Sequence, residues 1–147
     1  MKAVVKAKPS PGIEIREVGL PAPQPGEVLV RVEAVGICGS DVHIYEWTPG
    51  YDFLTPHFPL TLGHEFAGEI VDSRSNSFRT GEKVTSETGR ICGKCFFCKQ
   101  GKGVLCSLRS SFGRIGLERN GAMAEFVAVH EDCLHRIPPG YPWKKRP

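Results

Sequence analysis

The chain has 147 residues, a formal net charge of +3, 24% charged residues and 40% hydrophobic residues. This length suits one domain, or one domain with a small satellite, and the composition excludes intrinsic disorder. No apolar run approaches the length of a membrane span, and residues 1–6 contain no signal-peptide apolar region. We therefore expect a cytoplasmic protein without a membrane partner.

Short β-type segments, separated by turns rich in Gly and Pro, dominate the chain. Apolar and charged residues alternate in several of them, as in half-buried strands. Strands are predicted at residues 3–7, 13–18, 27–35, 66–71, 83–84, 123–129 and 133–137. One helix is predicted at residues 40–47, with Ser40 as its cap and Pro49-Gly50 ending it. Short strands without β-α-β alternation indicate a barrel or a sandwich.

Four of the six cysteines lie within a 15-residue window, with the spacing C-x-x-C-x-x-C and then seven residues before the fourth. Gaps of two residues let neighbouring thiolates face one tetrahedral Zn²⁺. Iron–sulfur ligation and disulfides are weaker alternatives, because ferredoxin spacings differ and the chain has no signal peptide. The predicted ligands of a structural zinc are Cys92, Cys95, Cys98 and Cys106.

Charge is spread unevenly along the chain. Residues 1–90 hold 9 basic and 12 acidic residues, whereas residues 91–147 hold 10 and 4. A basic half is compatible with nucleic-acid binding, and Phe96-Phe97 between Lys94 and Lys99 faintly resembles such a surface. However, lysines also offset the negative charge of four zinc-bound thiolates, and we expect no nucleic-acid partner.

A second group of polar residues lies in the runs G-I-C-G-S-D-V-H (36–43) and G-H-E-F-A-G (63–68). Taken alone, Cys38 is more often a small buried hydrophobe than a metal ligand, and His64 is more often structural. Occurring together, and ahead of the cysteine cluster, the two runs favour a joint chemical role.

These runs and the four-cysteine segment, in this order, resemble the zinc-containing medium-chain dehydrogenases that act on alcohols, polyols and threonine. The resemblance covers about residues 1–140. It implies a mainly β fold, a partly open GroES-like barrel with a few short helices and a protruding structural-zinc lobe at about residues 88–110. Residues 141–147 are expected to form a loose tail.

The resemblance also implies a catalytic zinc held by Cys38, His64 and Glu65, with an open position for a substrate oxygen. Ser40 would contact the substrate hydroxyl and His43 would pass its proton outward. The expected reaction is oxidation of a secondary alcohol on a small polar molecule, with hydride transfer to NAD or NADP. The full-length enzyme could form homo-oligomers.

Two departures from the family pattern limit what the resemblance implies for this chain. The chain lacks the Gly-rich β-α-β unit of a Rossmann domain, so we expect no turnover by the chain alone. The resemblance also implies that the third protein ligand of the catalytic zinc lies just beyond residue 147, so we expect weak catalytic-zinc binding. The turn at residues 72–77 is one residue shorter than usual and lacks glycine. The alternative function is an inactive zinc-binding GroES-like module, or a truncated product, with an interaction role.

Overall fold

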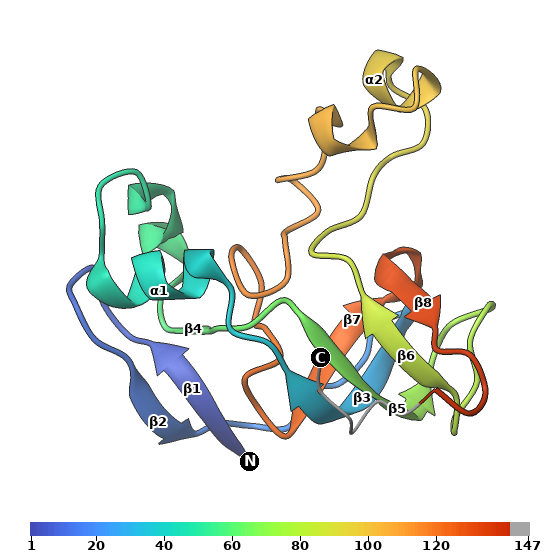
Figure 1. The fold of residues 1–147 in the computed structure, drawn as a ribbon, viewed down its shortest axis with the longest axis horizontal. Helices are drawn as coiled ribbons and strands as arrows, with labels where there is room; N and C mark the ends of the chain where they lie inside the picture. The colour runs from blue at the N-terminus through green and yellow to red at the C-terminus, as the bar shows by residue number, and fades with distance from the viewer. Residues whose placement is uncertain (142–147) are drawn as a thin grey trace.

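Two antiparallel sheets frame the molecule in the computed structural model, which describes residues 1–141 (Figure 1). The three-stranded sheet has the order β2-β1-β4 and the five-stranded sheet the order β7-β3-β5-β6-β8. The strands are β1 (Lys2–Lys6), β2 (Glu14–Glu17), β3 (Glu27–Val35), β4 (Leu60–Thr61), β5 (Phe66–Ser73), β6 (Lys83–Ser86), β7 (Phe126–His130) and β8 (Leu134–Arg136). Every ladder between these strands is antiparallel. Residues 1–141 therefore contain no parallel dinucleotide-binding sheet.

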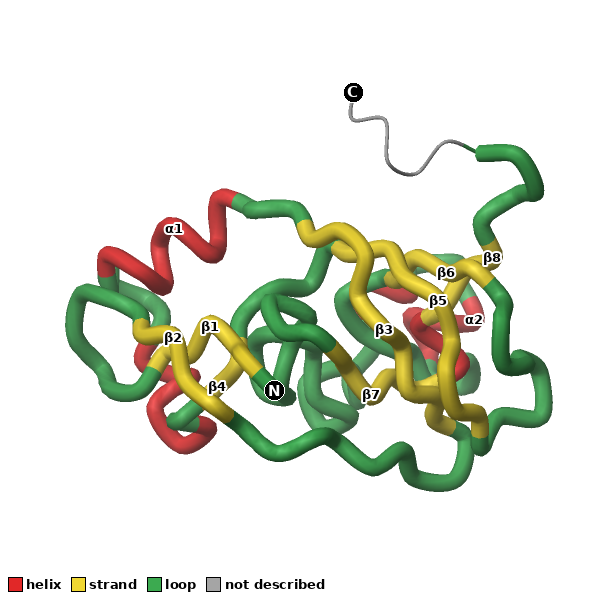
Figure 2. The backbone as a smooth tube through the Cα atoms, turned by 90° about the horizontal axis from the view of Figure 1, so that it is seen from below, coloured by secondary structure: helices red, strands yellow, loops and turns green. Residues whose placement is uncertain are grey.

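The helices are short and lie outside the sheets (Figure 2). They are α1 (Gly39–Glu46) and α2 (Phe96–Lys99), with 3-10 helices η1 (Asp52–His57), η2 (Gly103–Leu105) and η3 (Glu131–Cys133). None of the helices within residues 1–141 has the length and hydrophobicity needed to cross a membrane. The mainly β architecture predicted from the sequence is confirmed.

The core of the larger sheet is built in part from strands in which every second residue is buried. In β5, the buried residues Phe66, Gly68 and Ile70 alternate with less buried neighbours. Phe66 and Ile70 pack with apolar side chains from β3, β6, β7 and β8 in one cluster of buried residues. A second cluster lies beneath α1 and contains Ile44, Leu54, Leu60, Leu62 and Leu117. The molecule thus has one core against the five-stranded sheet and another beneath the α1 helix.

The start of α1 differs from the prediction. The helix begins at Gly39 with Cys38 as its N-cap, so Ser40 is the second helical residue and the prediction that it caps the helix is wrong. The Asp41 side chain instead accepts a hydrogen bond from the Cys38 backbone N–H at 2.9 Å. A carboxylate three residues after the cap satisfies an otherwise free backbone donor, as in a capping box.

A buried carboxylate anchors the start of β3. Glu27 is only 6% exposed and accepts hydrogen bonds from the Gln24 backbone N–H at 3.0 Å and from the Arg119 guanidinium. Burial opposes ionisation of Glu27, but these two partners outweigh it and lower its pKa. The ion pair ties β3 to the segment that precedes β7.

The short turn at residues 72–77 is ordered without glycine. The Glu131 carboxylate accepts hydrogen bonds from the Ser75 hydroxyl and from the backbone N–H groups of Asn76 and Ser77, the latter two at 3.1 and 3.2 Å. The hydrogen bond from Ser75 and those from the backbone lower the Glu131 pKa. A carboxylate from another part of the chain therefore organises this turn.

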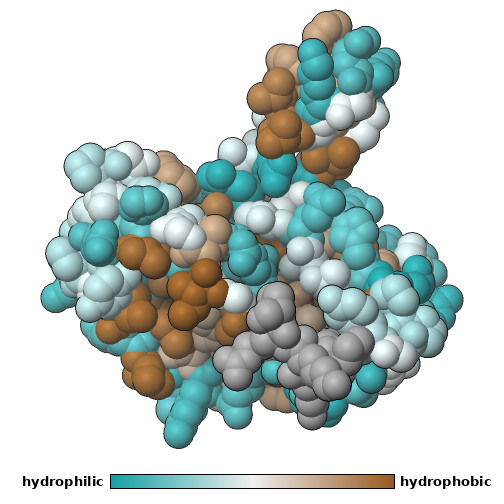
Figure 3. All heavy atoms as spheres, viewed as in Figure 1, coloured by the Kyte–Doolittle hydropathy of each residue, from teal (hydrophilic) through white to brown (hydrophobic). Residues whose placement is uncertain are grey.

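The segment between β6 and β7 projects from the body as a separate lobe that contains α2 and η2 (Figures 1 and 3). Its surface mixes hydrophilic and hydrophobic side chains, and Phe96 and Val104 are each 72% exposed. Tyr141, the last described residue, is 63% exposed. The rest of the predicted tail, residues 142–147, lies outside the described residues.

Candidate metal centres

Pairing of β3 with β5 brings together the two sequence runs at residues 36–43 and 63–68. The last residue of β3, Val35, is paired with the first residue of β5, Phe66. Beyond this pair, the Gly36 backbone N–H donates to the Glu65 carbonyl oxygen at 2.7 Å. Because one strand ends where the other begins, Cys38 and His64 are brought to the same edge of the sheet.

Three of the predicted ligands converge there. The Sγ atom of Cys38, a ring nitrogen of His64 and a carboxylate oxygen of Glu65 all lie within 4.8 Å of one another. Sulfur, imidazole nitrogen and carboxylate oxygen are the donors that Zn²⁺ takes in proteins, and three protein ligands leave a fourth position open. The donor set and its spacing fit a catalytic zinc. Its occupancy by a metal stays a prediction.

Ser40 lies beside this group and His43 lies further out. The Ser40 Oγ atom is 3.4 Å from the His64 Nε2 atom. His43 is on the same helix, exposed, and its ring stacks on Tyr51 with 5.9 Å between ring centroids. Within residues 1–141, no hydrogen bond joins the His43 ring to Ser40. The geometry therefore brings Ser40, but not His43, to the candidate ligands.

Asp41 is a site residue that the sequence analysis missed. Its Oδ1 atom lies 3.9 Å from the His64 Nδ1 atom, and both side chains are nearly buried, with 5% and 7% of their surface exposed. Neither of these two atoms has a hydrogen-bond partner. A carboxylate placed here favours the tautomer in which Nδ1 carries the proton and Nε2 is left unprotonated for a metal. The signal in the sequence is the three-residue spacing from Cys38.

Close backbone packing holds His64 in place. Gly63 has a φ of +90°, and a Cβ atom there would lie 2.7 Å from the Met123 Cγ atom. A Cβ atom on Gly121 would overlap the carbonyl oxygens of Leu62 and Gly63. Glycine is needed at both positions, because a side chain at either one would displace the segment that carries His64.

A buried lysine secures the other end of α1. The Lys6 Nζ atom donates to the carbonyl oxygens of Ser10 at 2.7 Å, Gly12 at 3.1 Å and Tyr45 at 3.3 Å. It also lies 5.2 Å from the ring centroid of Trp47, the residue that follows the helix. Burial lowers the pKa of Lys6, and these oxygens and the ring compensate its charge for the loss of water.

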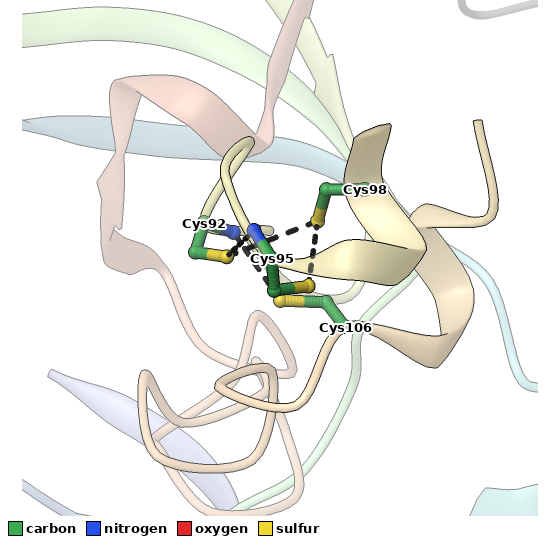
Figure 4. Close-up of side chains that lie close together, drawn as sticks. All are labelled: Cys92, Cys95, Cys98 and Cys106. Atoms are coloured by element: carbon green, nitrogen blue, oxygen red, sulfur yellow. Dashed lines mark hydrogen bonds between the residues drawn. The ribbon is translucent and has the colours of Figure 1, made fainter. Parts of the chain in front are cut away.

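The four cysteines of the lobe form the second candidate centre (Figure 4). The Sγ atom of Cys98 is 3.9 Å from that of Cys92 and 3.5 Å from that of Cys95. The four sulfur atoms, including that of Cys106, all lie within 4.8 Å of one another. A regular tetrahedron with Zn–S bonds of about 2.3 Å has edges of about 3.8 Å, so the spacing fits one Zn²⁺.

Local backbone donors favour thiolates at this centre. The backbone N–H of Cys95 donates to the Cys92 Sγ atom, and that of Cys92 donates to the Cys106 Sγ atom, both at 3.3 Å. Backbone hydrogen bonds from Cys98 and Ser107 lower the pKa of Cys95 to about 6. Burial and the neighbouring Cys95 raise the pKa of Cys98 to about 12. Ionisation of all four thiols, Cys98 included, therefore requires a cation among the sulfur atoms.

Comparison with known proteins identifies the family to which the chain belongs. Residues 24–139 match the family model described as the alcohol dehydrogenase GroES-like domain. Over 144 residues the chain is 41% identical to L-threonine 3-dehydrogenase of Chelativorans sp. (strain BNC1), covering 97% of this chain and 41% of that relative.

Two solved structures share the fold. Galactitol-1-phosphate dehydrogenase from Escherichia coli has a TM-score of 0.80 and 28% identity, covering 97% of this chain and 39% of its own. A zinc-binding dehydrogenase from Sinorhizobium meliloti 1021, bound to NADP, has a TM-score of 0.76 and 36% identity, with coverages of 94% and 38%. The chain spans about two fifths of the length of the relatives it matches. The chain belongs to the alcohol dehydrogenase GroES-like domain family.

Proposed function

We propose that this chain is the catalytic domain of a zinc-dependent, NAD(P)-linked alcohol dehydrogenase. The observation that carries the proposal is the convergence of Cys38, His64 and Glu65, whose ligand atoms lie within 4.8 Å of one another. The substrate class is a secondary alcohol on a small polar molecule, such as a polyol or a threonine-like compound. The relative named L-threonine 3-dehydrogenase supports this class.

The proposed organisation has residues 1–140 as the catalytic domain, with a structural-zinc lobe at about residues 88–110. The NAD(P) site would belong to a further domain, and the structure solved with NADP supports this class of cofactor. We also propose a cytoplasmic location, because all six cysteines are free and four of them suit a metal. A homo-oligomer is proposed only for the full-length enzyme.

The chain's own residues have distinct tasks in this mechanism. Cys38, His64 and Glu65 would hold the zinc, which when bound acts as a Lewis acid toward the substrate oxygen. Ser40 is next to His64, and its hydroxyl oxygen would accept a hydrogen bond from the substrate hydroxyl. Asp41 would hold the imidazole so that Nε2 faces the ligand group. His43 is exposed and would receive the proton at the surface.

Metal analysis of the purified chain tests the proposal. We expect two Zn²⁺ per chain, one bound tightly by the lobe and one more weakly. Cys38→Ala should remove only the weaker zinc and Cys98→Ala only the tighter one. Cys133→Ala is the control, because Cys133 is buried and lies outside both groups. A chain that binds one zinc, with Cys38→Ala unchanged, would contradict the proposed catalytic site.

A second measurement tests the chemistry. In the Co²⁺-substituted chain, 1,3-butanediol should perturb the visible absorption of the metal held by Cys38, and Ser40→Ala should weaken this response. We expect no NAD(P)-linked turnover by the chain alone, because residues 1–141 contain no dinucleotide-binding sheet. Absence of any response to alcohols would favour the alternative, an inactive zinc-binding module.

A further inference from the structure

A cavity beside the candidate catalytic centre contains a positive charge that the proposed mechanism does not use. The cavity has a volume of about 460 Å³, and its lining includes His64, Thr88, Arg109, Ser110 and Arg114. Sites for small molecules in proteins commonly have volumes of 300–1,000 Å³. Because His64 belongs both to this lining and to the candidate ligand group, the cavity adjoins the proposed metal.

Arg109 lines this cavity and has no role in the proposed mechanism. Its side chain is half-buried, and its Nε atom would lie 3.6 Å from a Cβ atom placed on Gly89. Within residues 1–141, no carboxylate forms an ion pair with Arg109 and no side-chain hydrogen bond involves it. A guanidinium at a cavity wall that is not engaged by a carboxylate can pair with an anionic group that enters the cavity. Arg109 is therefore available to such a group.

The second arginine of the cavity behaves differently. Arg114 donates to the Glu118 carboxylate through Nε at 3.0 Å and also through Nη2. This pairing, despite the opposing effect of burial, raises the pKa of Arg114. Arg114 thus has a carboxylate partner, whereas Arg109 has none within residues 1–141. The side chains of Thr88 and Ser110 add hydroxyl donors to the same lining. The cavity therefore offers one guanidinium without a carboxylate partner and two hydroxyl groups, beside Cys106 and the apolar side chains of Val104, Leu105 and Leu117.

We infer that Arg109 binds an anionic group, a carboxylate or a phosphate, of the substrate whose hydroxyl is oxidised at the Cys38–His64–Glu65 centre. A guanidinium offers two parallel N–H donors that match a carboxylate or a phosphate. This inference rests on the proposed function, and it narrows the substrate class from polar secondary alcohols to hydroxy acids or sugar phosphates. Arg109 is then a specificity-determining residue.

The test compares two alcohols that differ in charge. The Co²⁺-substituted chain is titrated with 3-hydroxybutyrate and with 1,3-butanediol, which has a neutral hydroxymethyl in place of the carboxylate. The visible absorption of Co²⁺ reports binding of the hydroxyl at the metal. The NMR resonance of the Arg109 Nε–H group, recorded on the Zn²⁺-loaded chain because Zn²⁺ is diamagnetic, reports binding of the anion. We expect 3-hydroxybutyrate to bind more tightly and to shift the Arg109 resonance, and 1,3-butanediol to leave that resonance in place.

Variants then assign the preference to one side chain. Arg109→Gln should weaken 3-hydroxybutyrate binding about 10- to 100-fold, the usual effect of losing a charged hydrogen bond, and leave 1,3-butanediol unchanged. Arg109→Lys should retain part of the preference. Arg74→Gln is the matched control, because Arg74 is exposed and does not line the cavity, and it should change neither affinity. Tetrathiolate absorption of the cobalt-loaded lobe reports whether each variant is folded.

Each outcome decides one of the two claims. Equal binding of 3-hydroxybutyrate by the parent and Arg109→Gln would overturn the inference, while a response of the metal to 1,3-butanediol would leave the proposed function intact. If neither alcohol perturbs the metal but 3-hydroxybutyrate still shifts the Arg109 resonance, the proposed function fails and the anion site stands. A shift caused more strongly by ADP-ribose would assign the anion to the cofactor and would also overturn the inference.

Discussion

Asp41→Asn tests whether the carboxylate next to His64 controls metal binding. Asparagine keeps an oxygen for the Cys38 backbone N–H but can turn its amide N–H₂ toward the His64 Nδ1 atom, now 3.9 Å from a carboxylate oxygen. With Nε2 bound to a metal, Nδ1 carries a proton, so two donors would then face each other. We expect weaker binding of the second zinc and an unchanged zinc at the four cysteines.

The magnitude follows from the separation. Two unit charges 3.9 Å apart interact by about 4 kcal/mol at an effective dielectric constant of about 20. A metal-bound imidazole carries only part of a charge, so we expect the usual effect of losing such a partner. This effect is a 10- to 100-fold loss of metal affinity, or about 1.4–2.8 kcal/mol.

Competition of the chain with a chromophoric zinc chelator measures this affinity, and the four-cysteine site serves as an internal reference. Asp52→Asn is the matched control, because Asp52 is exposed in the first turn of η1 and lies outside both metal groups. The reasoning is refuted if Asp41→Asn binds the second zinc as tightly as the parent chain does.

Three other predictions concern the support of the site. Lys6→Met should lower the free energy of unfolding by about 2–3 kcal/mol, because three carbonyl oxygens lose a charged donor, whereas exposed Lys8→Met should change it by less than about 0.5 kcal/mol in urea denaturation. Gly121→Ala should cost about 1–3 kcal/mol or more by overpacking and also weaken the second zinc, whereas Gly19→Ala, in open space, should do neither in thermal melts and zinc titrations. Glu27→Gln should cost about 1 kcal/mol at neutral pH, because its arginine partner is partly exposed. Since the Glu27 pKa is lowered by folding, its contribution is present above the ordinary value near 4.3 and is lost as the pH falls through the lower folded value. Urea denaturation at a series of pH values should therefore show the gap between parent and variant closing below about pH 4.3, and a gap that widened on acidification would contradict this account.

Regular patterns in the sequence predicted the main strands of the fold well. The apolar alternation at residues 27–35 coincides with β3, and the run at residues 66–71 lies within β5. The two-residue spacing of the cysteines, a local property, predicted sulfur atoms that do converge. In contrast, β4 has two residues and η1 contains Pro56, so neither has a length or a period that a pattern could reveal.

Features that depend on distant contacts were not predictable. Ser40 is a good capping residue by type, but the helix begins one residue earlier than predicted, at Gly39, and the Asp41 side chain bonds the backbone of the N-cap residue Cys38. The closeness of Asp41 to His64 depends on the pairing of β3 with β5. Arg109 is one of several basic residues in the second half of the chain, and only the folded lobe brings it into a cavity with His64.

The two groups of candidate metal ligands differ in whether their members are brought together by local or by long-range contacts. The four cysteines span 15 consecutive residues of a projecting lobe, whereas Cys38 and His64 are joined through strand pairing in the barrel. A locally closed unit can open without the rest of the molecule. Amide hydrogens of α2 and η2 should therefore exchange at a rate set by free zinc concentration, independently of those in β3 and β5. In folding, the lobe would form early and the catalytic centre late, because only the catalytic centre requires long-range contacts.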